Sequence, residues 1–143
     1  MMNGAMEATI PPVHKMGIRV VEADRGHAVA SVPFEGNGNH FGVVYAGVQF
    51  TVAEMLGGVI ALATFDAAKY YPLVKGVDIE FTGMARTDLR AETSLDEDEL
   101  ARIEAEAAEK GKADFTLDAV VSDDAGQTVS VTRGLYQLRA HGR

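Results

Sequence analysis

The segment AGVQFTVAEMLGGVIALAT, residues 46–64, restricts the fold of this chain more than any other part of the sequence. A helix that is apolar on nearly every side must be buried on every side, so we expect the rest of the chain to wrap around it. Gly57 and Gly58 each cost about 1 kcal/mol relative to alanine in a helix. Close approach of another backbone is the expected compensation. The apolar residues of the segment are Val48, Phe50, Val52, Leu56, Val59, Ile60 and Leu62.

Strands are predicted on both sides of this helix. Residues 18–23 and 28–34 are rich in Val and Ala, and the turn residues 24–26 between them predict a hairpin. Residues 76–85 alternate between apolar and polar side chains, as a half-buried strand does. Further strands are predicted over residues 89–93, 115–121 and 128–138. Short turns join most of these strands, which indicates an antiparallel sheet.

A second helix, on the surface, is predicted over residues 94–110. Ser94 to Glu97 fits a capping box, and Gly111 is a typical helix stop. The order strand, strand, buried helix, strand, strand, surface helix, strand, strand predicts the α+β class, with an antiparallel sheet wrapped around one long central helix. We expect one domain over residues 1–143, with a lead-in over 1–15 that is partly helical before Pro11.

Composition excludes several classes of function. The chain has 143 residues, no cysteine, a formal charge of -8 and a pI near 4.9. Disulfides, thiolate metal sites and a cysteine nucleophile are therefore excluded, and an acidic chain is a poor partner for nucleic acid. Neither a signal peptide nor a transmembrane span is predicted, so we expect a cytoplasmic protein without a membrane partner. No metal site is predicted, because none of the histidines has ligand spacing; they are His14, His27, His40 and His141.

Glu54 lies in the middle of the apolar helix and is the main candidate for chemistry. Burial of a carboxylate costs several kcal/mol unless something compensates for it. Burial also raises the pKa of a carboxyl group, which suits a general base or a nucleophile. Two structural explanations stay open. Glu54 could pair with Lys75 or Arg86, or it could face a solvated seam between subunits.

The segment from Asn39 to Gly47 leads directly into the start of this helix. The first N–H groups of a helix have no internal partners and can hold a developing oxyanion, so Ala46 and Gly47 are candidate donors. Ala46 and Glu54 lie about 12 Å apart along one helix axis. A site that uses both therefore predicts a two-fold dimer in which two antiparallel helices lie side by side. Alternatively, Gly47 serves only tight packing.

At these residues the chain resembles the hotdog-fold acyl-CoA thioesterases. It is similar to the phenylacetate-pathway and 4-hydroxybenzoyl-CoA thioesterases, and more specifically to the DUF4442 branch. The resemblance is carried by Asn39, Gly42, Tyr45-Ala46-Gly47 and Glu54, by residues 77–92 and by the insert over residues 94–115. Tyr45 stands where many members have His, and Ala46 where many have Gly.

The resemblance implies a thioester hydrolase. It gives Glu54 the role of nucleophile or general base, gives Ala46 and Gly47 the oxyanion N–H groups, and places Asn39 at the substrate or water. It implies coenzyme A as part of the substrate, no other cofactor, and a homodimer or a dimer of dimers. A non-catalytic module that binds acyl-CoA or acyl carrier protein, an enoyl-CoA hydratase and a purely structural oligomer stay open as alternatives. The residues expected to bind substrate are His40, Phe41, Tyr45, Phe50 and Met55, with Arg86 and Arg90, and Lys69 and Lys75 as further candidates, for the CoA phosphates.

Overall fold

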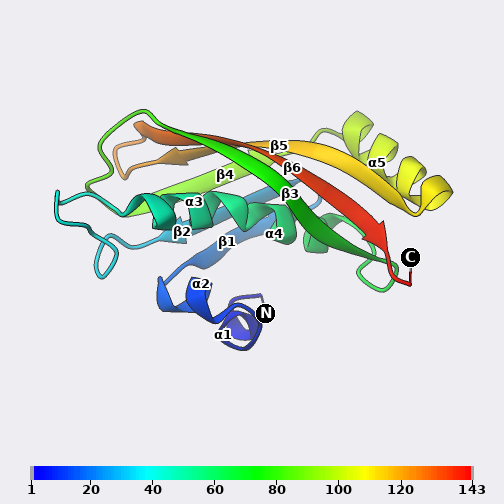
Figure 1. Ribbon diagram of the computed structural model, residues 1–143, viewed down its shortest axis with the longest axis horizontal. Coiled ribbons are helices and arrows are strands. Elements are labelled where there is room, and N and C mark those ends of the chain that lie inside the picture. Colours follow the sequence, from blue (N-terminus) through cyan, green and yellow to red (C-terminus); the bar gives the residue numbers. More distant parts are fainter. Residues whose placement is uncertain (1, 143) are drawn as a thin grey trace.

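The structure is a computed structural model that describes residues 2–142. A six-stranded antiparallel sheet has the order β1-β2-β4-β5-β6-β3, and the central helical segments lie along one of its faces (Figure 1). The strands are β1 (Arg19–Asp24), β2 (His27–Val32), β3 (Tyr70–Phe81), β4 (Leu89–Ser94), β5 (Lys112–Ser122) and β6 (Thr128–Ala140). The helices are α1 (Met2–Thr9), α2 (Pro11–Lys15), α3 (Ala46–Glu54), α4 (Leu56–Thr64) and α5 (Glu97–Lys110). The predicted α+β class and element order are confirmed.

The predicted central helix is present as α3 and α4, which run end to end. Met55 joins them and keeps right-handed helical backbone angles, with φ -66° and ψ -14°. Val52, Leu56 and Ile60 are fully buried against the sheet. By length and apolar composition alone residues 46–64 could cross a membrane, but about half of the segment, 56%, is buried inside the protein, as in the core helix of a globular domain.

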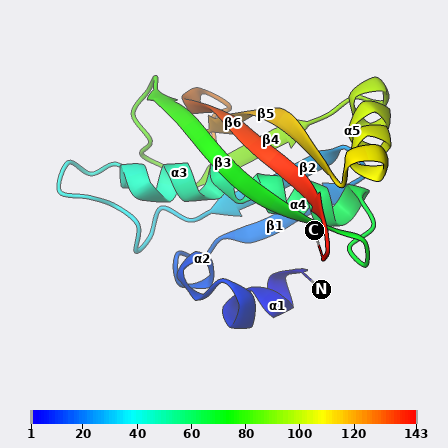
Figure 2. The same cartoon turned by 45° about the vertical axis from the view of Figure 1, so that its right-hand side comes forward.

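The expectation that this helix is buried on every side is wrong for the single chain. Phe50 is 36% exposed and Leu62 is 54% exposed, and Glu54 and Gly58 between them are half-buried. These four residues recur every four positions, so they form one stripe along the helix. The physical reason is coverage: the sheet packs on one side of the helix (Figure 2), and α1 lies across an apolar groove from α4, so neither covers this stripe.

The β3 strand begins six residues earlier and ends four residues earlier than the sequence predicted. The run Tyr70 to Val74 pairs with β6, and the register shifts by one residue between Val74 and Gly76. This bulge interrupts the expected alternation of apolar and polar side chains. The extra residue shifts every residue before it to the opposite face of the sheet. Pro72 is tolerated because β3 is an edge strand. Strands β5 and β6 also extend beyond their predicted ends.

Helix α5 begins at Glu97, so the predicted capping box at Ser94 is wrong. Ser94 still belongs to β4, where it pairs with His27. The N-cap is Asp96, whose side chain accepts a hydrogen bond of 2.8 Å from the backbone N–H of Glu99. Gly111 ends the helix in the left-handed conformation, with φ 79°, as predicted.

The lead-in is helical before Pro11, as predicted, over α1, and a second short helix that the sequence did not predict, α2, begins at Pro11. Pro11 occupies the first turn of α2, where its missing N–H costs nothing. Asn3 anchors α1 to β1 with two hydrogen bonds to Val20: its Nδ2 donates to the carbonyl oxygen at 3.0 Å, and its Oδ1 accepts from the backbone N–H at 2.7 Å. Met6 of α1 is buried in the core. The N-terminal helices therefore pack against the β1 edge of the sheet (Figure 1).

Candidate active site

Glu54 is the last residue of α3 and lies on the half-exposed stripe, between Phe50 and Gly58. Loss of hydration raises the pKa of its carboxyl group above the usual value. Among residues 2–142, no side chain donates a hydrogen bond or forms an ion pair to this carboxylate. Lys75 is 3.0 Å from Asp114 instead, and Arg86 is exposed elsewhere. The two pairings considered from the sequence are therefore absent, and Glu54 faces outward from an apolar surface.

Tyr136 of β6 positions the residue that carries this carboxylate. Its hydroxyl donates a hydrogen bond of 3.0 Å to the main-chain oxygen of Glu54. Burial, together with the negative charge of Glu54, raises the pKa of the Tyr136 phenol. The ring is only 4% exposed and stacks on Phe115, with ring centroids 5.8 Å apart. A neutral phenol therefore ties the end of α3 to the sheet.

Two glycines make room for the Tyr136 ring. A methyl group at Gly57 would come within 2.7 Å of Cζ and closer still to Cε1 of that ring, and one at Gly134 would lie 2.5 Å from Cε2. The expectation that Gly57 allows approach of another backbone is wrong, because an aromatic ring from the same chain fills the space. Gly58 has open space around it. Sequence reasoning missed Tyr136, although a glycine inside strand β6 is a signal of close approach.

The start of α3 presents unpaired backbone donors. Tyr45 is the N-cap, and its carbonyl oxygen accepts from the N–H groups of Val48 and Gln49 at 3.0 and 3.1 Å. Within residues 2–142 no acceptor is found for the N–H groups of Ala46 and Gly47. The ring of Tyr45 lies over Gly47, 2.6 Å from where a methyl group would be. These donors lie at the opposite end of α3 from Glu54, about 12 Å away along the helix axis.

The loop before α3 is shaped by two asparagines. Asn39 Oδ1 accepts from the N–H groups of Phe41 and Val43 at 2.9 and 3.4 Å, so this oxygen is used in holding the loop. Asn37 is buried, and its Nδ2 donates to the carbonyl oxygens of Met16 and Pro33 at 2.7 and 2.8 Å. Sequence reasoning missed the structural role of Asn37, because its partners lie outside the loop.

An open hollow of about 340 Å³ lies beside this loop and the start of α3. Asn39, His40 and Tyr45 line it, and Val48 of α3 closes one side. The ring of His40 lies 4.0 Å from that of Phe41, which is 72% exposed. One chain therefore brings Asn39, His40 and Tyr45 together, but it does not bring them to Glu54.

The two arginines considered for phosphate binding lie on different parts of the protein. Arg86 is exposed and follows Ala85, whose carbonyl oxygen accepts a 2.7 Å hydrogen bond from Val44 of the α3 loop. Arg90 points to the sheet face away from α3, 3.3 Å from Glu92. Of the two, Arg86 is beside the loop and Arg90 is not.

A buried polar group in α3 lacks one partner. Gln49 is only 4% exposed, and its Nε2 donates to the carbonyl oxygen of Val44 at 2.9 Å. Its Oε1 has no hydrogen-bond partner within the described part of the chain. The bond to Val44 fastens the loop to the helix, which positions Tyr45 and the free N–H groups.

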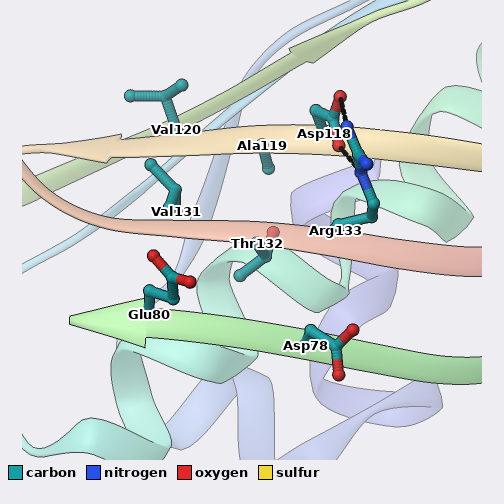
Figure 3. Close-up of a pocket in the computed structure, with 8 residues that line it drawn as sticks. All are labelled: Asp78, Glu80, Asp118, Ala119, Val120, Val131, Thr132 and Arg133. Atoms are coloured by element: carbon teal, nitrogen blue, oxygen red, sulfur yellow. Dashed lines mark hydrogen bonds and ion pairs between the residues drawn. The ribbon is translucent and has the colours of Figure 1, made fainter. Parts of the chain in front are cut away.

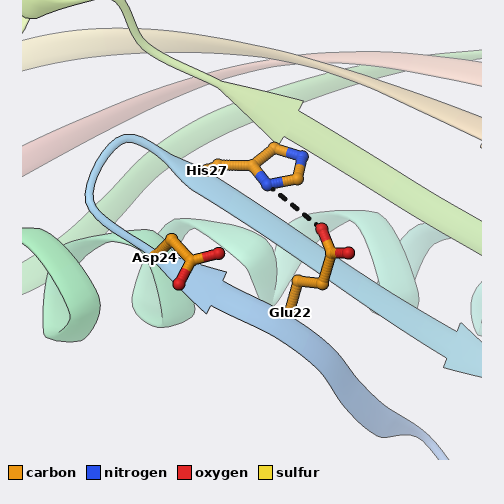
Figure 4. A group of neighbouring side chains, drawn as sticks. All are labelled: Glu22, Asp24 and His27. Carbon is orange, nitrogen blue, oxygen red and sulfur yellow. Dashed lines mark ion pairs between the residues drawn. The ribbon is translucent and has the colours of Figure 1, made fainter.

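Two clusters of charged residues lie away from Glu54. Glu22, Asp24 and His27 meet at the β1–β2 hairpin (Figure 4), where His27 Nδ1 is 3.2 Å from Glu22 and Nε2 contacts Glu92. These residues could hold a cation by type, but the ion pairs already use both ring nitrogens. On the outer sheet surface Arg133 donates to Asp118 at 2.7 and 3.1 Å (Figure 3), beside exposed acidic residues of β3.

Comparison with known proteins agrees with this fold. Residues 1–138 match the family described as Domain of unknown function (DUF4442). A crystal structure of a Pseudomonas aeruginosa protein of unknown function, described as a probable thioesterase, is 38% identical with a TM-score of 0.91 and covers 97% of this chain and 93% of its own.

More distant structures share the fold. A Chlorobaculum tepidum protein of unknown function is 20% identical, with a TM-score of 0.84 over 96% of this chain and 91% of its own. A Haemophilus influenzae thioesterase is 13% identical, with a TM-score of 0.77 over 99% of this chain and 92% of its own. No curated protein matches the sequence. The predicted hotdog fold is confirmed.

Proposed function

Because this chain belongs to the DUF4442 family and has a thioesterase-like hotdog fold, we propose that it hydrolyses acyl-CoA thioesters with Glu54 as general base or nucleophile. The observation that carries the proposal is the state of this carboxylate. It lies on an apolar helix stripe, loss of hydration raises its pKa, and no cation of the described chain neutralises it. A carboxylate held in this way is poised to take a proton from water or to attack a carbonyl.

The proposed oxyanion donors are the N–H groups of Ala46 and Gly47. They are the unpaired donors at the positive end of the α3 dipole, where a developing negative charge is stabilised. Within one chain they lie about 12 Å from Glu54 along the axis. The site is therefore complete only if a second chain supplies one half, so the proposed active form is a two-fold dimer with two equivalent sites.

The uncovered surfaces support a dimer through β3 and the helix stripe. β3 is an edge strand, and its helix-facing side chains include Val74 and Phe81, which are about half exposed. Long apolar edges lead to aggregation unless something covers them. Antiparallel pairing of two β3 strands would cover both edges and would bring two copies of the Phe50–Leu62 stripe together.

Coenzyme A is proposed to enter along the loop before α3. The hollow lined by Asn39, His40 and Tyr45 lies at the helix start, and Arg86 is the exposed cation beside that loop. Arg90 is not included, because it pairs with Glu92 on the other sheet face. No cofactor other than the CoA of the substrate is proposed, and we keep the cytoplasm as the proposed compartment.

The first experiment measures thiol release from acyl-CoAs of several chain lengths by wild-type protein, Glu54→Gln and the control Glu109→Gln on the exposed face of α5. Glu54→Gln is expected to lose activity while it keeps acyl-CoA binding, and Glu109→Gln to match the wild type. Binding of acyl-CoA by the wild type without thiol release would overturn the proposal in favour of a binding module.

Complementation tests the shared site. Ala46→Pro removes one proposed oxyanion donor at the first helical position, which accepts proline, and Tyr45 before it already has ψ 138°. Loss of one donor is expected to lower kcat about 100-fold or more. Mixed dimers of Ala46→Pro and Glu54→Gln contain one intact site, so the mixture should recover about a quarter of wild-type activity. Mixtures as inactive as the separate variants would refute a site shared between chains.

A further inference from the structure

An apolar groove of about 310 Å³ separates α1 from α4. None of the residues that line it carries a charge, although the chain as a whole has a net charge of -8. Met2 and Met6 form much of the α1 wall, and Met55, Val59 and Leu62 form the helix wall. The volume is at the lower end of the range for small-molecule sites. The groove therefore suits a small, uncharged, apolar ligand.

The groove is continuous with the surface that carries Glu54. Gly58, at one edge of the groove, follows Glu54 by four residues and so lies on the same helix face one turn further on. The space beside Gly58 is open, since a methyl group placed there would meet nothing within 4 Å. A molecule held at the Glu54 carboxylate can therefore extend past Gly58 into the groove without obstruction from this chain.

The size of the groove fits a short alkyl chain. Its helix wall runs from Met55 to Leu62, which is about 10 Å along the axis. An extended chain advances roughly 1.2 Å per bond, so about eight carbons fill that length. Three of the six methionines of the sequence line the groove. Methionine side chains adapt to ligands of variable shape, which suits a flexible alkyl chain better than one fixed ring.

We propose that the groove between α1 and α4 binds the alkyl part of a medium-chain acyl group, with the thioester at Glu54 and the chain end at Leu62. This inference rests on the function proposed above and gives it a substrate class, aliphatic acyl-CoAs of about eight carbons. Gly58 is the specificity-determining position, because a larger side chain there closes the path between the carboxylate and the groove.

The test compares Gly58→Leu with a matched control, Ala105→Leu, which adds a similar side chain on the exposed face of α5. Thiol release is measured with butanoyl-, octanoyl- and dodecanoyl-CoA. Each buried methylene is worth about fourfold in binding, and leucine displaces about three of them, so kcat/KM for octanoyl-CoA should fall about 60-fold. Gly58→Leu should lower activity on butanoyl-CoA far less than activity on octanoyl-CoA, and Ala105→Leu should match wild type on all three substrates.

A second variant, Ala5→Leu, narrows the groove from the α1 side and leaves the residues of the helix stripe unchanged. It should lower octanoyl-CoA hydrolysis in the same chain-length-dependent manner, while Leu62→Ala should extend the preference to longer chains. The proposal that the groove binds the alkyl chain is overturned by either of two results in both Gly58→Leu and Ala5→Leu. One is an equal loss of activity on all three substrates, and the other is an unchanged chain-length profile. Light scattering on each variant identifies a change of assembly. If the chain-length profile changes only in variants that lose the oligomer, a second copy of the chain occupies the groove and the proposal is overturned.

Binding separates failure of the groove from failure of the proposed function. The thioether S-octyl-CoA cannot be hydrolysed, and its Kd is measured by calorimetry on the same proteins. If wild-type protein releases no thiol but binds S-octyl-CoA, and Gly58→Leu weakens that binding about 60-fold, the proposed hydrolysis is refuted and binding of the alkyl chain in the groove is supported. If the wild type hydrolyses acyl-CoAs but binds S-octyl-CoA no better than S-ethyl-CoA, binding of the alkyl chain in the groove is refuted and the proposed hydrolysis is supported.

Discussion

Replacement of Gly57 and of Gly58 by alanine should have opposite effects on stability, although the residues are neighbours in one helix. Alanine gains about 1 kcal/mol over glycine in a helix interior. At Gly58 no atom of the same chain opposes this gain, because none lies within 4 Å of the added methyl group. At Gly57 the new methyl group would lie 2.5 Å from Cδ1 of Tyr136 and closer to Cε1, well inside contact distance.

The Tyr136 ring has no room to move away from a methyl group at position 57. Its hydroxyl is bonded to the Glu54 carbonyl oxygen, its other edge lies against Gly134, and it stacks on Phe115. Overpacking of a fixed core group costs about 1–3 kcal/mol, and loss of the Tyr136 hydrogen bond adds about 1 kcal/mol. After subtraction of the helix gain, Gly57→Ala should destabilise by about 2 kcal/mol.

Thermal and urea unfolding of the two variants measure this difference directly. Gly58→Ala should raise the free energy of unfolding by about 1 kcal/mol, which places the two variants roughly 3 kcal/mol apart, or about 10 °C in Tm for a chain of this size. Gly134→Ala is the positive control for a crowded ring. Equal stability of Gly57→Ala and Gly58→Ala would refute the reasoning that the Tyr136 ring leaves no room for a side chain at position 57.

Three further predictions concern single side chains. The raised pKa of Glu54 means that the folded state binds a proton more tightly than the unfolded state, so ionisation of Glu54 destabilises the fold as pH rises above its unfolded pKa. Glu54→Gln should therefore unfold at a higher Tm than wild type at pH 7.5, and the difference in Tm should shrink toward pH 4. A difference in Tm that widens on acidification contradicts this. Asn37→Ala should cost about 2 kcal/mol in urea unfolding, because two partly buried carbonyl oxygens lose the donor that the buried Asn37 supplies, whereas Asn39→Ala should cost less. Asp96→Ala should cost about 1 kcal/mol through loss of the α5 cap, and an equal cost from Ser94→Ala would restore the capping box that the sequence predicted.

The order of elements could be predicted from the sequence because each element carries a local pattern. The apolar segment 46–64, the alternation of β5 and the Gly111 stop are signals that need no distant partner. The start of β3 could not be predicted, because a bulge near Gly76 reverses the alternation that identifies a strand.

The candidate site was predictable only in part, for the same physical reason. Glu54 is identifiable as a carboxylate in an apolar helix, which is a local feature. Tyr136 and Asn37 act through hydrogen bonds to backbone atoms that are far away in the sequence, and no pattern along the chain indicates such partners. The incomplete burial of α3 and α4 is likewise a property of tertiary coverage, which helix periodicity does not contain.

The anchoring of α1 by Asn3 has a consequence for motion. An isolated helix of eight residues is unstable in water, so α1 keeps its shape only while it stays seated on β1. Elements of this kind open locally long before the rest of a protein unfolds. The amide hydrogens of residues 2–9 should therefore exchange with solvent earlier than those of β5 and β6, and occupancy of the space beneath this helix should slow that exchange.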